Sequence, residues 1–146
     1  MKSVSLLLLS LLSIATFSAN ADITNAEKLA TKYYSIAKEI NPDFKAPSVN
    51  DGKTFFNRQF NVNGKQVACA SCHTSNPADE GKHIVTGKPI RPLSPAVNEK
   101  RFSDIEKVEA KFTEHCNDIL GADCTAAEKS NFISYLLTEK TPSVKK

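Results

Sequence analysis

The segment Cys69-Ala70-Ser71-Cys72-His73 decides what this chain can fold around. Two cysteines three positions apart on a tight turn can each add to one of the two vinyl groups at the edge of a haem, and C-x-x-C-H is the signature of that attachment. The histidine that follows then lies under the iron, where its imidazole is the proximal ligand. The motif therefore predicts one covalent haem c, bound through Cys69 and Cys72 and coordinated by His73.

Two other chemistries use closely spaced cysteines. A thioredoxin-like dithiol places its C-x-x-C at a helix start after a strand of a βαβ unit, and no such strand precedes Cys69. A structural zinc site built from all four cysteines would need a second close pair, but Cys116 and Cys124 are eight positions apart. Both interpretations are weaker than the haem interpretation.

The N-terminus predicts export. Met1-Lys2 gives a short positive start, residues 4–17 are almost wholly apolar, and Ala19-Asn20-Ala21 supplies small residues where a signal peptidase cleaves. The apolar run is shorter than the ~20 residues that a spanning helix needs, which makes an uncleaved anchor the weaker alternative. We expect residues 1–21 to be a cleaved signal peptide and residues 22–146 to form a soluble monohaem cytochrome c domain in the periplasm. This is the environment in which c-type haem is attached.

Length and composition limit the number of domains and the classes of binding partner that we expect. The chain has 146 residues, which suits one domain. Its formal net charge of +3, from 19 basic and 16 acidic residues, is too balanced for an obligate nucleic-acid-binding protein, so we expect no nucleic-acid partner.

The pattern of apolar residues predicts an all-α fold. About four helices are expected, over residues 24–40, 50–60, 104–117 and 126–138. Capping boxes indicate three helix starts, at Thr24 with Glu27, Ser103 with Glu106, and Thr125 with Glu128. The first helix carries an apolar stripe of Leu29, Tyr33, Ile36 and Ile40. Residues 61–101 are rich in glycine and proline and predict a long irregular segment, with a strand pair only near Asn63-Gly64.

The sixth iron ligand decides what such a protein does. Methionine is excluded, because the only methionine is Met1, in the predicted signal. The remaining candidates are His83, His115, a lysine, an asparagine, water, or no ligand at all. If Cys116 pairs with Cys124, the backbone beside His115 is pinned by a bridge worth roughly 2–3 kcal/mol. That preorganisation favours His115 over His83.

Three basic residues are candidates to neutralise the haem propionates, since carboxylates beside a buried haem need hydrogen-bond donors. They are Lys88, Arg91 and Arg101. Each is equally well explained as a solvated surface charge.

The order and spacing of several motifs also resemble those of a known protein family. The run Thr86-Gly87-Lys88-Pro89-Ile90-Arg91-Pro92-Leu93-Ser94-Pro95, then Arg101-Phe102, Cys116 and Cys124-Thr125 with Glu128-Lys129, resembles the sphaeroides haem protein family of small monohaem cytochromes c, over about residues 23–137. The resemblance implies a class I-like cytochrome c fold, haem bound through Cys69, Cys72 and His73, and a Cys116–Cys124 disulfide. It also implies reversible binding of diatomic ligands, and a dihaem cytochrome c and a membrane cytochrome b as electron-donating partners.

One position departs from that family. The best-known member has an asparagine before the first disulfide cysteine as a weak distal ligand, where this chain has His115. The match strengthens His115 as sixth ligand, and a diatomic molecule would have to displace its imidazole. We therefore expect an electron carrier rather than an enzyme, with iron between His73 and His115 and a low reduction potential. The alternatives are binding or reduction of oxygen or nitric oxide at the iron, and a structural or chaperoning role in cytochrome assembly.

Overall fold

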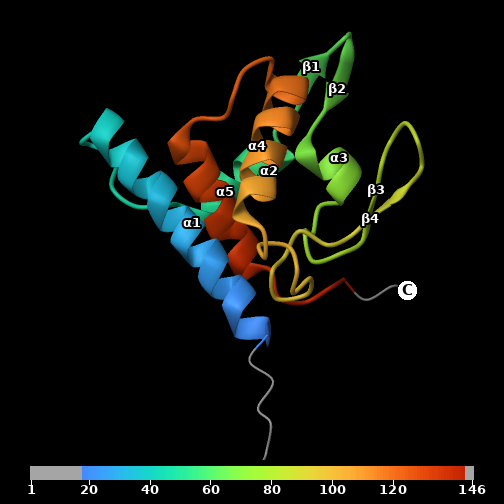
Figure 1. Ribbon diagram of the computed structural model, residues 1–146. Coiled ribbons are helices and arrows are strands. Elements are labelled where there is room, and N and C mark those ends of the chain that lie inside the picture. Colours follow the sequence, from blue (N-terminus) through green and yellow to red (C-terminus); the bar gives the residue numbers. More distant parts are fainter. Residues whose placement is uncertain (1–17, 144–146) are drawn as a thin grey trace, which may run out of the picture.

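The computed structural model describes residues 18–143, and Figure 1 shows a helical molecule with two small hairpins at one side. Helices α1 and α5 pack along one another, α2 packs on α5, and β1 lies against α4. This confirms the all-α class. In chain order the elements are α1 (Ser18–Ile40), α2 (Val49–Asn57), β1 (Phe60–Val62), β2 (Lys65–Val67), α3 (Cys69–His73), β3 (Gly81–Lys82), β4 (Pro89–Ile90), α4 (Ile105–Leu120) and α5 (Ala126–Thr138).

Residues 1–17 lie outside the described residues, and with them most of the predicted signal peptide. Among the described residues, no helix is long and apolar enough to cross a membrane. The division into residues 1–21 and 22–146 stays a prediction.

The start of the first helix was predicted wrongly. Helix α1 already begins at Ser18, upstream of Thr24, because alanine is the strongest helix former and the run before Thr24 holds two of them. The apolar stripe is confirmed at Leu29 and Tyr33, which are buried, and Ile36 packs against the same core. It is wrong at Ile40, which is 77% exposed because the helix runs on past the core at its last residue.

The two C-terminal helices begin in different ways. Helix α5 begins as predicted: the Glu128 carboxylate accepts the Thr125 amide proton at 2.9 Å, and the Thr125 hydroxyl accepts the Glu128 amide proton at 3.2 Å. The expected box at Ser103 is wrong. Asp104 caps α4 instead, accepting the Lys107 amide proton at 3.1 Å, while the Ser103 hydroxyl donates to a backbone carbonyl before the helix.

The segment predicted to be irregular contains more regular structure than expected. The pair near Asn63-Gly64 is confirmed: β1 and β2 are antiparallel, and both turn residues have positive φ, as a tight hairpin turn requires. The haem motif forms the short helix α3, and β3 pairs with β4. The second hairpin was not predicted, since two-residue strands are too short to show an alternating pattern.

The core lies where α1, α2 and α5 meet. Phe56, Ile133, Tyr135 and Leu136 are almost fully buried there. Helix α2 approaches α5 so closely that a β-carbon at Gly52 would collide with the backbone carbonyl of Asn131. Only glycine fits at this crossing.

We therefore expect Gly52→Ala to lower the free energy of unfolding by about 3 kcal/mol, because the added methyl group forces two buried helices apart. Guanidinium unfolding of the haem-loaded protein, followed by circular dichroism, measures the change. Lys53→Ala, at the next and exposed position of α2, is the matched control and should change the stability little. Equal midpoints for Gly52→Ala and the parent protein would contradict the close approach.

Candidate haem site

Helix α3 presents the attachment motif. Its first turn is closed by Ser71, whose hydroxyl accepts the Ala68 amide proton at 2.9 Å. The chain leaves the helix sharply at Thr74, a non-glycine residue with φ of 61° and ψ of 174°. Cys69 and Cys72 are half-buried and unpaired on this single turn. Two free thiols on one short helix are the arrangement that covalent haem attachment requires.

The chemistry of Cys69 argues against a redox dithiol. Burial raises the pKa of the Cys69 thiol to about 11. Catalytic cysteines of C-x-x-C oxidoreductases have a lowered pKa, because the thiolate is the nucleophile. No βαβ unit precedes α3 within the described residues. The thioredoxin-like interpretation therefore finds no support here.

The chain that follows α3 is packed tightly against it. A β-carbon at Gly81 in β3 would collide with the Cys72 carbonyl, so β3 rests directly on the end of α3. Pro77 follows the motif, and its carbonyl accepts the amide protons of Leu93 and Ser94 at 2.8 and 3.0 Å. These contacts hold the motif against the loop that leads toward α4.

His73 and His115 face each other. His73 ends α3 and His115 lies on α4, with ring centroids 6.5 Å apart and ring planes at 40°. Two imidazoles that bind one metal ion from opposite sides at about 2 Å each place their ring centres about 6.4 Å apart. The spacing therefore fits one iron between the two rings.

His83 lies elsewhere. It is exposed in the β3–β4 hairpin, where its Nδ1 accepts the amide protons of Val85 and Thr86 at 3.2 and 3.1 Å. One ring nitrogen of His83 is thus used by its own loop. Of the two candidate distal histidines, the structure brings His115 opposite His73.

Both facing imidazoles are suited to bind a metal ion at neutral pH. Burial, together with the nearby charges of Arg101 and His115, lowers the pKa of His73 to about 4. Burial also lowers the pKa of His115. Both rings are neutral at pH 7, as coordination requires.

Of the three basic residues proposed for the propionates, Arg101 is the one whose charge acts on both His73 and His115. It is half-buried, and burial lowers the pKa of its guanidinium. Among the described residues, no carboxylate forms an ion pair with it. Nearby Asp22 instead accepts the Phe102 amide proton at 2.7 Å through one carboxylate oxygen, and its other oxygen is buried without a donor. A guanidinium that feels the Asp22 charge but makes no ion pair, and whose own charge acts on both imidazoles, is suited to a haem propionate.

Lys88 and Arg91 are not placed with Arg101. Both are exposed, at the two ends of β4, and none of their contacts in the described part of the chain leads to His73 or His115. The assignment of Lys88 to a propionate stays a prediction that this geometry does not favour.

The structure pairs Cys116 with Cys124 across 5.5 Å between their Cα atoms. The bridge joins the end of α4 to the start of α5, next to His115, and packs with Phe55. Because Cys116 and Cys124 are bonded to each other, they cannot serve as thiolate ligands in a zinc site built from all four cysteines. Within the described residues, no three His, Cys, Asp or Glu side chains converge on a common metal position.

Sequence reasoning missed a clamp on the disulfide loop. The Lys129 ammonium is buried, lies 3.0 Å from the Asp123 carboxylate, and sits over the rings of Tyr33 and Phe112 at 5.3 and 5.9 Å. Lys129 directly follows a capping box, where a lysine is normally a solvated surface residue. The sequence therefore offered no reason to expect its burial or its ion pair. The clamp ties the loop beside His115 to α1 and α5.

Together, a helical fold, two free cysteines on the turn before His73 and a second histidine facing it define a class, the small monohaem c-type cytochromes. A family model described as a domain of unknown function, DUF1924, matches residues 42–136. Cytochrome c'' from Methylophilus methylotrophus is 65% identical over 130 residues, which are 87% of this chain and 90% of that protein. Its oxidised crystal structure has a TM-score of 0.81, covering 84% of this chain and 100% of that one.

The relationship to the sphaeroides haem proteins is also found. The cytochrome c-type protein SHP from Cereibacter sphaeroides is 35% identical over 72 residues, which are 49% of this chain and 55% of that protein. A structure of oxidised SHP, described as an oxygen-binding cytochrome c, has a TM-score of 0.65 at 28% identity, covering 76% of this chain and 94% of that one. The chain belongs to this family of c-type cytochromes with covalently bound haem, as the resemblance indicated.

Proposed function

We propose that this protein is an exported electron carrier whose haem iron is held between His73 and His115. The observation that carries the proposal is the 6.5 Å separation of the two imidazole rings. It is supported by the sequence, in which no methionine follows Met1 to take the distal position.

Each residue has a distinct role in this proposal. Cys69 and Cys72 fix the haem on α3, and the haem supplies one-electron redox chemistry when bound. His73 and His115 would hold the iron from two sides and keep water from it, which would leave the cofactor to carry electrons rather than to bind a substrate. Arg101 balances a propionate charge. The resemblance to the sphaeroides haem proteins supports periplasmic export, with a dihaem cytochrome c and a membrane cytochrome b as electron donors.

Spectroscopy of the haem-loaded protein tests the ligand set. The oxidised protein should give a low-spin electron paramagnetic resonance spectrum, because two imidazoles form a strong axial field. Potentiometric titration should give a reduction potential below that of His/Met cytochromes, since methionine ligation raises the potential. A high-spin oxidised spectrum, or a potential in the His/Met range, would refute the proposed ligation.

A second function has its own supporting observation. His115 is only partly shielded and more exposed than His73, and no hydrogen bond holds its ring among the described residues, whereas His73 follows directly on the attachment turn. Detachment of His115 would open the iron to a diatomic ligand. Two relatives fit this idea: SHP is described as oxygen-binding, and a solution structure of cytochrome c'' is described as bearing on haem-ligand detachment.

Carbon monoxide separates the two functions. If His115 stays bound on reduction, carbon monoxide should leave the spectrum of the reduced protein unchanged, and the protein is a carrier only. If His115 detaches, the Soret band should shift at once, and the same should happen with nitric oxide. Deoxygenated protein reduced by dithionite is the sample for both gases.

A further inference from the structure

Lys129 is a buried charge. Its side chain is only 8% exposed, whereas the other lysines and arginines that form ion pairs in the described part of the chain are 49–85% exposed. A buried ammonium is costly unless it is paired, and removing one partner of a buried ion pair is strongly destabilising. The groups that Lys129 contacts are therefore strongly coupled to it.

The helix that carries Lys129 is itself firmly anchored. At the next position of α5, the buried Ser130 hydroxyl donates to the Ala30 carbonyl of α1 at 3.0 Å. The Lys129 amide donates to the Thr125 carbonyl at 3.0 Å, at the capped start of the helix. The ammonium thus projects from a rigid base toward aromatic rings of α1 and α4.

Lys129 contacts the chain on both sides of His115. Its ammonium lies 5.9 Å from the ring centroid of Phe112, which is one turn before His115 on α4. It also lies 3.0 Å from both carboxylate oxygens of Asp123. Asp123 directly precedes the second cysteine of the disulfide, and the first cysteine directly follows His115. A single side chain therefore connects the segment before the histidine to the loop after it.

Tyr33 extends this connection to α1. The Lys129 ammonium lies 5.3 Å from the centroid of the Tyr33 ring, and that ring meets Phe112 edge-on with 6.0 Å between the ring centroids. The Tyr33 hydroxyl also donates to the Glu109 carboxylate at 3.2 Å. Cation–π contacts are strongest where the cation is shielded from water, as this buried ammonium is. The end of α4 is thereby held against α1 and α5 through Lys129.

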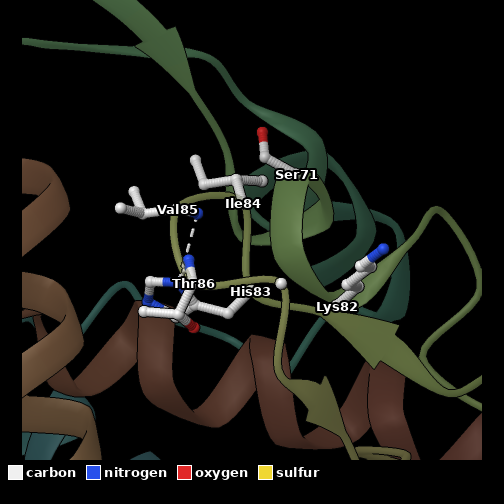
Figure 2. A pocket seen from close by; sticks show the side chains of 7 residues that line it. Ser71, Lys82, His83, Ile84, Val85 and Thr86 are labelled. Atoms are coloured by element: carbon white, nitrogen blue, oxygen red, sulfur yellow. Dashed lines mark hydrogen bonds between the residues drawn. The ribbon is translucent and has the colours of Figure 1, made fainter.

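The His115 ring has no comparable support of its own. No hydrogen bond holds it within the part of the chain that the structure describes. The other distal candidate, His83, differs, because its ring accepts the amide protons of Val85 and Thr86 within its own hairpin (Figure 2). The place of the His115 ring therefore depends on the position of α4 and of the disulfide loop, both of which Lys129 holds.

We propose that Lys129 is a positioning residue, which holds His115 toward His73 and slows the release of the His115 imidazole from the haem iron. This rests on the proposed function, in which both imidazoles bind the iron. Without the ammonium, Asp123 and the disulfide loop would gain freedom, and the end of α4 would move away from α3 more readily. Coupling of this kind passes through contiguous packed groups. The consequence is a faster exchange of His115 for an external ligand, with no change in the oxidation state of the iron.

Cyanide binding to the oxidised, haem-loaded protein measures that release. Cyanide needs a free axial position, so at saturating cyanide the rate of the Soret shift equals the rate at which His115 leaves. Lys129→Met removes the charge and keeps most of the apolar stem. It should raise this limiting rate about tenfold, because a buried ion pair and two cation–π contacts are lost. The amides of residues 117–125 should also exchange hydrogen faster, which mass spectrometry measures independently of the haem spectrum.

Two further variants test whether the effect passes through Asp123. The Asp123 side chain is 51% exposed, so Asp123→Asn should fold normally, and it should also raise the limiting rate. The double variant Lys129→Met, Asp123→Asn should be no faster than the faster single variant, because the two side chains act as one unit. Lys107→Met is the matched control. It breaks the exposed Lys107–Asp104 ion pair at the start of α4 and should change the rate less than about twofold.

The outcomes separate the role of Lys129 from the ligation on which it rests. An unchanged limiting rate in Lys129→Met would overturn the positioning role, and if that variant does not fold, an unchanged rate in Asp123→Asn would do so. Equal acceleration by Lys107→Met would also overturn it, since any weakening of α4 would then suffice. Failure of the proposed ligation has a different signature: the oxidised parent protein would be high-spin, and its rate of cyanide binding would rise with concentration without reaching a limit.

Discussion

Joint replacement of Cys69 and Cys72 by alanine should yield a polypeptide without covalent haem. Each thiol is expected to form one thioether bond, so without both sulfur atoms only the His73 and His115 imidazoles could hold the group. Mass spectrometry of the denatured protein should show the bare chain, and haem staining of a denaturing gel should be negative. This is the largest effect that we expect from any substitution, because it removes the cofactor.

Two further variants keep this result informative even if the double variant folds poorly. Cys69→Ala alone should retain the haem through one thioether, and the remaining free vinyl group should shift the α band of the reduced protein to longer wavelength. Ser71→Ala lies inside the same motif and keeps both thiols, so its haem content should equal that of the parent. Covalent haem in the double variant would show that other residues make the attachment.

Replacement of His115 by alanine should convert the oxidised iron from low spin to high spin almost completely. Under the proposed ligation, the variant removes one of the two imidazoles that would hold the iron and leaves the other, His73, directly after the attachment turn. Electron paramagnetic resonance measures the spin state directly. The reduced variant should also bind carbon monoxide at once, whether or not the parent protein does.

The control for this substitution is the other distal candidate. His83→Ala should leave the spin state unchanged, because the His83 ring is engaged by the amides of Val85 and Thr86 in an exposed hairpin. Added imidazole should return His115→Ala to low spin by filling the vacated position. A His115→Ala protein that remains low-spin without imidazole, or a high-spin His83→Ala protein, would contradict the assignment.

Capping residues predicted the start of a helix correctly where no neighbouring residue offered a competing start. Thr125 and Glu128 marked the start of α5 correctly, since the residues before them cannot continue a helix through the disulfide loop. Thr24 and Glu27 make the same pattern, but α1 begins earlier because helix-forming residues precede them. Ser103 was expected to cap α4, but the carboxylate of Asp104, one position later, caps it instead. In each case the outcome depended on competition between neighbouring residues.

The identity of the cofactor and of its proximal ligand could be predicted from five consecutive residues, 69–73, since the spacing of two thiols and an imidazole on one turn is a local property of the chain. Likewise, the sequence excluded methionine as the distal ligand, because the only methionine is Met1, in the predicted signal peptide. Whether His115 or His83 faces His73, and whether Arg101 or Lys88 lies beside them, was decided only by the packing of α3, α4 and the β3–β4 hairpin. Those residues are far apart along the chain, and the distances between them depend on how helices and loops pack, which no short stretch of sequence encodes.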